Sequence, residues 1–527
     1  MNDQLYQLHN QQNRNKMIAK TFGSSVYGVN ASIVTVETNI ISGTNFHIVG
    51  LPDNAVKESQ QRVESALKHN GYTVSRRKIV VNLAPADVRK EGSAFDLPIA
   101  LGVLQSSDQI HAPQLNQYVI LGELALDGEL RPIKGILPIA IEARKHKFKG
   151  FILPKQNASE AAIVNNIDII GVSHLQEAID FLEGRLVIKP TTKDTRDIFY
   201  DSQNDYEADF SNVQGQENIK RALEIAAAGG HNVIMIGPPG AGKTMLARRL
   251  PSILPPLNLH EALETTKIHS VAGKLDTESS LIAQRPFRAP HHTISDVALV
   301  GGGGNPQPGE ISLAHNGVLF LDELPEFKRT VLEVMRQPLE ERQVTISRAR
   351  ISVDYPANFM LIASMNPCPC GYYNHPDKEC VCAPGTVQRY LNKISGPLLD
   401  RIDLHVEVTP VSFDQMTANR KTESSGEIRQ RVIAAREIQQ ERFKEQAEIH
   451  SNAMMPPQMV KEICQLDIVG RNLLKAAMTK LGLSARAYDR ILKVARTIAD
   501  LNGQESIKTE YVAEAIQYRS LDREGWA

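Results

Sequence analysis

Cysteine, tryptophan and long apolar runs are scarce in this chain of 527 residues, and each scarcity excludes a class of protein. The chain has 5 cysteines and 1 tryptophan. Four cysteines lie between Cys368 and Cys382, so they cannot form a disulfide framework spread along the chain. Apolar runs such as 233–236 are far shorter than the about 20 residues of a membrane-spanning helix, and the amino end lacks a signal-peptide pattern. We expect a cytoplasmic protein with no membrane partner.

An excess of charge of one sign is also lacking. Lys and Arg number 59 against 60 Asp and Glu, a formal net charge of −1. Any contact with a polyanion must therefore come from a local patch. Hydrophobic residues make up 42% and charged residues 23%, which is ordinary for a globular protein and excludes a disordered or fibrous one. At about 150 residues per domain, the length allows roughly three to four domains.

Patterning divides the chain into five segments. Residues 1–19 are Asn/Gln-rich at their start and read as a frayed tail or as a start placed before a true beginning at Met17. Residues 20–184 form an α/β domain, because β-branched runs alternate with helical patterns. The runs are 32–38, 78–83, 151–153 and 168–172, and the helices 55–68, 97–104 and 137–145. The polar stretch 185–210 has few apolar anchors and indicates a linker.

A second α/β pattern covers 211–411, and helical periodicity dominates 412–527. Expected helices in the latter are 427–448 and 485–501, the second with Ser484 as N-cap and Gly503 at its end. In the former, apolar strands at 232–236, 317–321 and 359–363 each run into a polar loop. Buried parallel strands deliver loops to one sheet edge in this way.

The first of these strands leads into the sequence GPPGAGKT, which fits G-x-x-x-x-G-K-[ST]. The residues are Gly237, Pro238, Pro239, Gly240, Ala241, Gly242, Lys243 and Thr244. In such a loop, backbone N–H groups surround the phosphates, the lysine reaches the β- and γ-phosphates and the hydroxyl ligates Mg²⁺. The alternative is a Gly/Pro turn with an incidental lysine, which the flanking strand and helix patterns disfavour.

The other two strands end in polar residues suited to the same triphosphate. Asp322 holds magnesium through its water shell, and Glu323, one residue on, polarises the attacking water. Asn366 orients that water or touches the γ-phosphate as a neutral group. The alternative for Asn366 is the start of an Asn-Pro turn. We expect the three strands to lie side by side.

Two arginine positions and a cysteine group are further candidates. Arg401 stands between Asp400 and Asp403, and such an arginine, delivered to a neighbouring subunit's γ-phosphate, neutralises transition-state charge. A local ion-pair cluster is the alternative. Arg486 belongs to a basic helical stripe with Arg490 and Lys493, for which a solvated face is the default.

Within a segment expected at 366–384, two C-x-C pairs are separated by nine residues. The cysteines are Cys368, Cys370, Cys380 and Cys382. Four thiolates can close a tetrahedral structural zinc site, which leaves no open position for catalysis. His375 is an alternative ligand, and reduced thiols or a redox pair are the alternative interpretation.

These motifs together resemble the magnesium-chelatase-like AAA+ ATPases, and within them the ComM/YifB family. The resemblance covers about residues 20 to 520 and rests on long strings such as HIVGLPDNAVKES (47–59), FRAPHHTISDVALVGGG (287–303) and SGPLLDRIDLHVEV (395–408). It implies Walker A at Lys243 and Thr244, Walker B at Asp322 and Glu323, sensor 1 at Asn366, an arginine finger at Arg401 and sensor 2 at Arg486.

The resemblance further implies a ring, a hexamer, that uses ATP and Mg²⁺ and moves on single-stranded or branched DNA. Branch migration during integration of transforming DNA is the activity associated with ComM. A helix-2 insertion at 285–308 and a pre-sensor-1 hairpin at 343–353 would face the pore. Arg348 and Arg350 of that hairpin are candidate DNA contacts, because a positive pore loop can track phosphates. An ordinary charged hairpin tip is the alternative.

Residues 20–184 look like the Lon protease domain, whose fold also serves proteins without peptidase activity. At 92–97 the sequence GSAFDL places Ala94 where the nucleophilic serine stands, and Ser93 and Lys134 are poor substitutes for the dyad. We expect no peptidase. A chelatase-like motor subunit that remodels a protein partner is the alternative function. The expected fold is thus multidomain α/β: a Lon-protease-like α/β domain, a helix-2-insert AAA+ P-loop core and a C-terminal helical lid.

Overall fold

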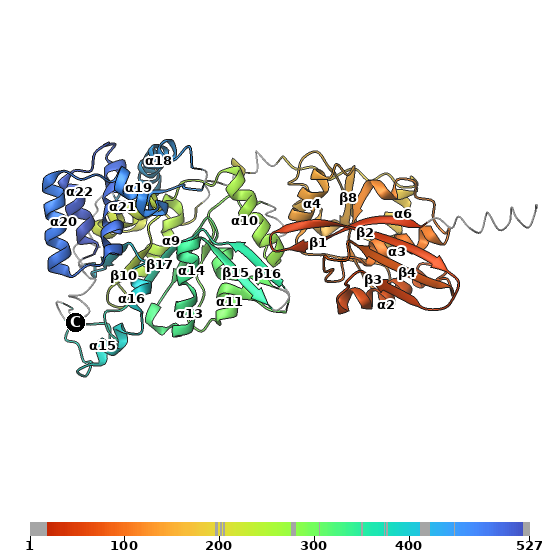
Figure 1. Ribbon diagram of the computed structural model, residues 1–527, viewed down its shortest axis with the longest axis horizontal. Coiled ribbons are helices and arrows are strands. Elements are labelled where there is room, and N and C mark those ends of the chain that lie inside the picture. Colours follow the sequence, from red (N-terminus) through yellow and green to blue (C-terminus); the bar gives the residue numbers. More distant parts are fainter. Residues whose placement is uncertain are drawn as a thin grey trace, which may run out of the picture. The chain divides into compact units, whose positions relative to one another are not determined.

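The computed structural model describes residues 18–527 except 195–198, 201–202, 204–205, 276–280, 305, 349–350, 374, 376–377, 412–421, 447 and 520–527. The described residues divide into two compact units, whose elements are labelled in Figure 1. The first unit takes in residues 1–198 and 266–281, and the second 199–265 and 282–527. Almost all of the expected tail, residues 1–17, lies outside the described part of the chain.

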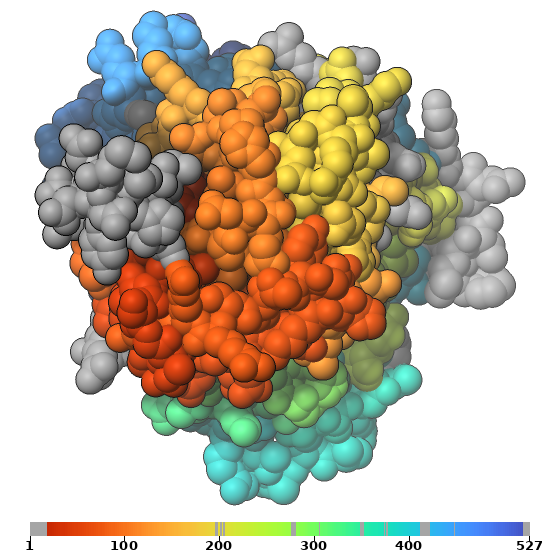
Figure 2. Space-filling model, turned by 90° about the vertical axis from the view of Figure 1, so that its right-hand side faces the viewer, coloured from red at the N-terminus to blue at the C-terminus, as the bar shows by residue number. Residues whose placement is uncertain are grey.

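The first unit is built on a mixed sheet with the strand order β3-β4-β2-β1-β5-β8-β9. Its strands are β1 Ala19–Tyr27, β2 Asn30–Ile41, β3 Phe46–Val49, β4 Lys78–Ala84, β5 Tyr118–Ile120, β8 Gly150–Pro154 and β9 Asp168–Val172, and a small ladder joins β6 Glu123–Leu124 to β7 Leu130–Arg131. Its helices are α2 Asn54–His69, α3 Asp96–Ser106, α4 Ile136–Lys145, α5 Ala158–Ala161 and α6 Leu175–Leu182. Figure 2 shows part of the surface of this unit in red to yellow.

Each strand and helix expected in this region is present, with ends shifted by a few residues. The pattern missed β1, which carries polar residues on its buried face. Thr21 is fully buried there, and its hydroxyl donates to the Pro98 carbonyl oxygen at 3.1 Å. Because a hydrogen-bonded hydroxyl can be buried at little cost, hydrophobic alternation does not reveal such a strand.

The second unit contains a parallel sheet in the order β11-β14-β17-β10-β18. Its strands are β10 Val233–Ile236, β11 Phe287–Arg288, β14 Val318–Leu321, β17 Met360–Met365 and β18 Leu404–Glu407. Two further ladders pair β12 Gly301–Gly302 with β13 Gln307–Pro308 and β15 Gln343–Arg348 with β16 Ile351–Pro356. Helices that precede or follow these strands are α8 Glu217–Gly229, α9 Lys243–Ile253, α10 Leu259–Ala272, α11 Asp296–Val300, α12 Glu310–Leu313, α13 Arg329–Val334, α14 Arg336–Glu341, α15 Thr386–Leu391 and α16 Gly396–Leu399.

The three strands expected to be neighbours are neighbours: β17 lies between β14 and β10. Phe320 is level with Ile362 on one side of β17, and Ile234 is level with Ala363 on the other. All three strands are almost entirely buried. Because they are parallel and in this register, the loops at their carboxyl ends emerge at one edge of the sheet.

The remainder of the second unit is helical, with α18 Ser425–Arg442, α19 Pro457–Ile463, α20 Ile468–Leu481, α21 Ala485–Leu501 and α22 Thr509–Gln517 (Figure 1). Helix α21 has the expected bounds, with the Ser484 hydroxyl accepting from the Ala487 N–H and Gly503 at a φ of +62°. Helix α18 ends at Arg442, before the expected 448, because the backbone of the next residue, Phe443, leaves the helical conformation with φ −104° and ψ 11°. Apolar residues of these helices and of the sheet form one continuous core.

The segment expected to be a linker, 185–210, contains two buried phenylalanines. Phe199 is 3% and Phe210 0% exposed, so these two positions are packed rather than free. Among the described residues, no helix has both the length and the apolar character needed to cross a bilayer.

Candidate functional site

The loop between β10 and α9 adopts the conformation that a phosphate-binding turn needs. Gly240 and Gly242 have φ angles of +78° and +89°, a region that side-chain-bearing residues rarely occupy. Gly242 is the last residue before α9, and Lys243 and Thr244 open that helix. The helix N-terminus and its free N–H groups therefore face the loop, which is the arrangement that attracts phosphate.

Lys243 is held at the centre of the site and is 8% exposed. Its Nζ donates to the carbonyl oxygens of Gly237 at 2.7 Å and Pro238 at 2.9 Å, and to Asn366 Oδ1 at 3.1 Å. These bonds use all three donors of the ammonium. Burial lowers the pKa of Lys243, while the nearby charges of Asp322 and Glu323 act against that shift. Lys243 thus spans from the phosphate loop to the end of β17.

Asp322 lies at the end of β14 and joins the phosphate loop through Thr244. The Thr244 hydroxyl donates to Asp322 Oδ2 at 2.7 Å. The other carboxylate oxygen accepts from the hydroxyl of Ser364, a fully buried residue of β17, and from the Glu323 N–H at 3.1 Å. A hydroxyl and a carboxylate side by side are the hard oxygen donors that Mg²⁺ prefers, so this pair fits a magnesium ion.

Glu323 occupies an unusual backbone conformation beside this pair. Its φ is +53°, a left-handed value that is uncommon for a residue other than glycine, asparagine or aspartate. The side chain is 56% exposed, and its Oε2 lies 3.5 Å from His292 Nδ1. Strained residues of this kind concentrate at functional sites.

Arg401 does not meet this group. It precedes β18, and its carbonyl oxygen accepts from Asn232 Nδ2 at 3.0 Å, at the start of β10. The phosphate loop follows the carboxyl end of β10. Arg401 and the phosphate loop therefore lie at opposite ends of the strands. The guanidinium is 8% exposed, and its nitrogens contact Glu340 Oε1 at 2.5 Å and the Pro397 carbonyl oxygen at 2.6 Å. In this arrangement, Arg401 is directed to Glu340 and away from the chain's own Lys243.

Arg486 and Arg490 of α21 lie near the Arg401 turn. Arg486 is 62% exposed and 4.0 Å from Asp400. Arg490 pairs with the buried Asp403, whose other oxygen accepts from the Asn232 N–H at 2.9 Å. These partners lower the pKa of Asp403 against the effect of burial. The stripe is therefore only partly a solvated face, since Arg490 joins the helical region to the sheet.

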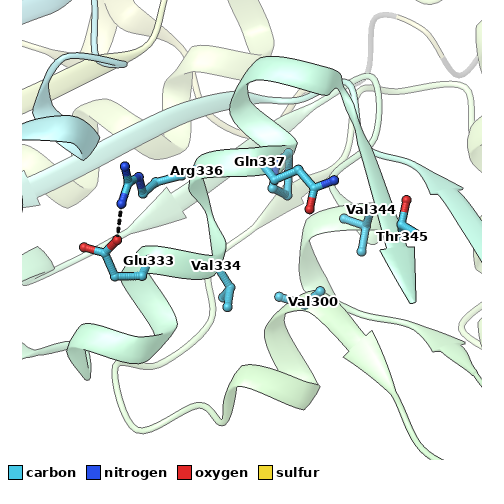
Figure 3. Close-up of a pocket in the computed structure, with 8 residues that line it drawn as sticks. Val300, Glu333, Val334, Arg336, Gln337, Val344 and Thr345 are labelled. Atoms are coloured by element: carbon cyan, nitrogen blue, oxygen red, sulfur yellow. Dashed lines mark hydrogen bonds and ion pairs between the residues drawn. The ribbon is translucent and has the colours of Figure 1, made fainter. Parts of the chain in front are cut away.

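The two segments expected to face a pore pack together. Strands β15 and β16 pair antiparallel, with Gln343 opposite Pro356, and the Tyr355 hydroxyl donates to the Pro306 carbonyl oxygen at 2.8 Å. A cavity of about 430 Å³ lies between α13, α14, the start of β15 and the end of α11 (Figure 3). Its lining includes Val300, Val344 and Thr345, and no residue of the phosphate site. The side chain of Arg348 and all of Arg350 lie outside the described residues.

The four clustered cysteines come together. Cys368, Cys370, Cys380 and Cys382 have sulfur atoms within 4.8 Å of one another. The ring of His375 instead lies edge-on to Tyr372, with centroids 5.6 Å apart, and the group of metal-ligating side chains does not include it.

In the first unit, Ser93 and Lys134 have different neighbours. The Ser93 hydroxyl donates to the Glu123 carboxylate, while the aliphatic part of Lys134 lies against Gly273. Neither contact is that of a hydroxyl activated by an amine.

The structure adds three residues that sequence reasoning passed over. Ser364, which supports Asp322, shows only as a hydroxyl two positions before Asn366 in an apolar strand. His292 lies in a string used for the resemblance but had no role. Glu340, the partner of Arg401, carries no local signal, since an exposed helix glutamate is ordinary.

Comparison with known proteins agrees with this geometry. Family models match residues 209–416 (magnesium chelatase, subunit ChlI), 36–157 (subunit ChlI of Mg-chelatase) and 422–519 (magnesium chelatase, subunit ChlI C-terminal). The competence protein ComM of Haemophilus influenzae is 45% identical over 510 residues, 96% of this chain and 98% of that protein. YifB of Escherichia coli is 45% identical over 502 residues, 94% and 96% of the two chains. Lon protease 2 of Bacillus subtilis is 34% identical over 153 residues, 27% of each chain.

Proposed function

Because the chain belongs to the ComM and YifB family of magnesium-chelatase-like proteins, we propose that it is an ATP-hydrolysing ring motor acting on DNA. The observation that carries the proposal is the meeting of Lys243, Thr244, Asp322 and Asn366 at the carboxyl edge of one parallel sheet. This set contains a cation and a loop for phosphates, oxygen ligands for a metal and a neutral amide for a water.

The residues divide the work of hydrolysis. When ATP binds, the Lys243 ammonium leaves the carbonyl oxygens of the loop and contacts the β- and γ-phosphates. The backbone N–H groups of the loop bind the remaining phosphate oxygens. Thr244 and Asp322 hold Mg²⁺, which when bound neutralises charge on the phosphates. Glu323 polarises the attacking water, and Asn366 orients that water against the γ-phosphate.

Arg401 completes the site of an adjacent subunit in a hexamer. Arg401 and Lys243 lie at opposite ends of the strands. This position suits an arginine that acts on the nucleotide of the adjacent subunit and not on the nucleotide of its own subunit. The pair with Glu340, which is half exposed, opens when the neighbour presents a γ-phosphate. Arg486, more exposed and close to the same turn, serves as sensor 2 from this side of the interface.

The DNA is single-stranded or branched, and the β15–β16 hairpin reaches it from inside the ring. The hairpin's packing on the 285–308 insertion favours joint movement of the two during the ATP cycle. Arg348 and Arg350 track the phosphates without reading bases. Branch migration in recombination, including integration of transforming DNA, is the activity proposed.

The four cysteines hold a structural zinc ion. Four converging sulfur atoms suit zinc, and a filled tetrahedron leaves no position for catalysis.

The test measures ATP turnover with and without single-stranded or three-stranded junction DNA, together with strand exchange on the junction. We expect DNA to stimulate turnover, and Lys243→Ala to abolish both activities. If DNA does not change ATP turnover and the protein does not bind DNA in a mobility-shift assay, the alternative of a chelatase-like motor that remodels a protein would be favoured. Absence of ATP turnover in the assembled wild-type ring would refute the proposal as a whole.

A further inference from the structure

The cysteine cluster lies in an irregular loop that begins where the nucleotide site ends. Between Asn366 and Gly385, none of the described residues belongs to a helix or strand. Of these four cysteines, only Cys368 is buried. A loop of this length without its own core needs another means of holding its shape.

The sulfur positions match a metal cluster and not disulfides. Cys368 Sγ lies 3.2 Å from Cys370 Sγ and 3.7 Å from Cys380 Sγ, and the last two are 3.5 Å apart. A disulfide requires about 2.05 Å, whereas sulfurs around zinc at 2.3 Å from the metal are about 3.8 Å apart. The Tyr373 N–H also donates to Cys368 Sγ at 3.3 Å, a bond that stabilises a thiolate.

This loop is packed directly against the phosphate loop. Gly371 is buried, with a φ of +85°, and a Cβ built on it would lie 2.5 Å from Pro239 Cδ. The Gly237 N–H donates to the Met365 carbonyl oxygen at 3.2 Å, one residue before Asn366. The segment that carries the first two cysteines therefore forms a wall of the phosphate loop.

The far end of the loop returns to the same place. Cys382 is followed by α15, which carries Tyr390. Tyr390 is 6% exposed. Burial raises the pKa of its phenol, and the nearby backbone of Asn366 acts against that shift. A metal bound by all four cysteines thus links the segment that follows Asn366 to the segment that leads into α15.

We propose that metal binding at the four cysteines and nucleotide binding at the phosphate loop are thermodynamically coupled, through the contact of Gly371 with Pro239. The metal fixes the position of the segment that contains Gly371. Pro239 and the phosphate loop then keep the conformation that binds phosphate, and Asn366 stays in contact with Lys243. This inference rests on the proposed ATPase function and zinc site. Because such coupling is reciprocal, bound nucleotide must in turn protect the metal.

The experiment measures zinc per chain by elemental analysis and the zinc dissociation constant by equilibrium competition with a chromogenic zinc chelator, with and without Mg·ADP. It also measures kcat and KM for ATP. Binding of a fluorescent ADP analogue is recorded for each protein. Gly371→Ala leaves four thiols in place but crowds Pro239, and Cys382→Ser removes one thiol. Cys464→Ala, which changes the remaining cysteine in the helical region, is the matched control, and thermal melting checks that each variant is folded.

We expect one zinc per wild-type chain and zinc bound about fivefold or more tightly with Mg·ADP, within the usual range of coupling. Gly371→Ala should keep its zinc, lose the protection by ADP and lose about tenfold in kcat. Cys382→Ser should lose zinc and kcat together, and Cys464→Ala should match wild type.

The same zinc dissociation constant with and without bound ADP, or full ADP protection in Gly371→Ala, would overturn the coupling. Wild-type protein without zinc would overturn the metal site. Wild-type protein that carries zinc but binds no ADP analogue would refute the proposed function as well, and the binding measurement identifies that case.

Discussion

Replacing Asn366 by alanine tests the assignment at the centre of the site. Asn366 Oδ1 accepts from the Lys243 ammonium at 3.1 Å, and the proposed role makes the amide contact the water and the γ-phosphate during hydrolysis. Hydrogen bonds that involve a charged group contribute about 1.5 to 3 kcal/mol. If that energy is expressed only in the transition state, kcat falls by about 10- to 150-fold.

The expected pattern for Asn366→Ala is a fall in kcat and kcat/KM by the same factor, with little change in nucleotide affinity. The assay is steady-state ATP turnover of the assembled ring, with fluorescent ADP binding measured in parallel. Asn366→Asp keeps the shape but adds a negative charge near Asp322, so it should impair turnover at least as much. A variant with wild-type kcat, or one in which only KM rises, would show that Asn366 merely begins the Asn-Pro turn.

Other predictions follow from the same geometry. Glu323→Gln should bind ATP and stall hydrolysis, which single-turnover assays with radiolabelled ATP will detect, and rapid hydrolysis would contradict the role of Glu323. Arg401→Ala should bind ATP without hydrolysing it, and mixing it with Glu323→Gln subunits should recover part of the turnover; an unimpaired Arg401→Ala protein would refute the finger. Glu340→Gln should release Arg401 and raise ring turnover by up to about fivefold, since a partly exposed pair is worth up to about 1 kcal/mol, and a decrease would show that Glu340 orients the arginine. Burial lowers the pKa of Lys493 from 10.5 to about 8. Between these pH values the unfolded chain binds more protons than the folded one, so the free energy of unfolding should rise by about 3 kcal/mol from pH 8 to 10.5. Urea unfolding of Lys493→Met should lack this rise.

The elements of the proposed nucleotide site were predictable from sequence because each is local. Loop 237–244, the carboxylates after β14 and Asn366 after β17 all follow short buried strands, and parallel strands bring such loops to one edge. Polar residues within strands were harder to place. Thr21 of β1 and Ser364 of β17 are fully buried, and only their hydrogen bonds, to partners far along the chain, explain why these hydroxyls are tolerated there.

By itself the sequence determined the parallel core, the phosphate loop with its flanking strand and helix, and the grouping of four cysteines, since these depend on periodicity and on contiguous residues. Only the tertiary structure decided that Arg401 faces Glu340, that Arg490 joins α21 to Asp403, and that Gly371 lies against Pro239. Each of these contacts joins residues about 60 to 130 positions apart. Side-chain direction and close packing between distant segments depend on the whole fold, and no local pattern encodes them.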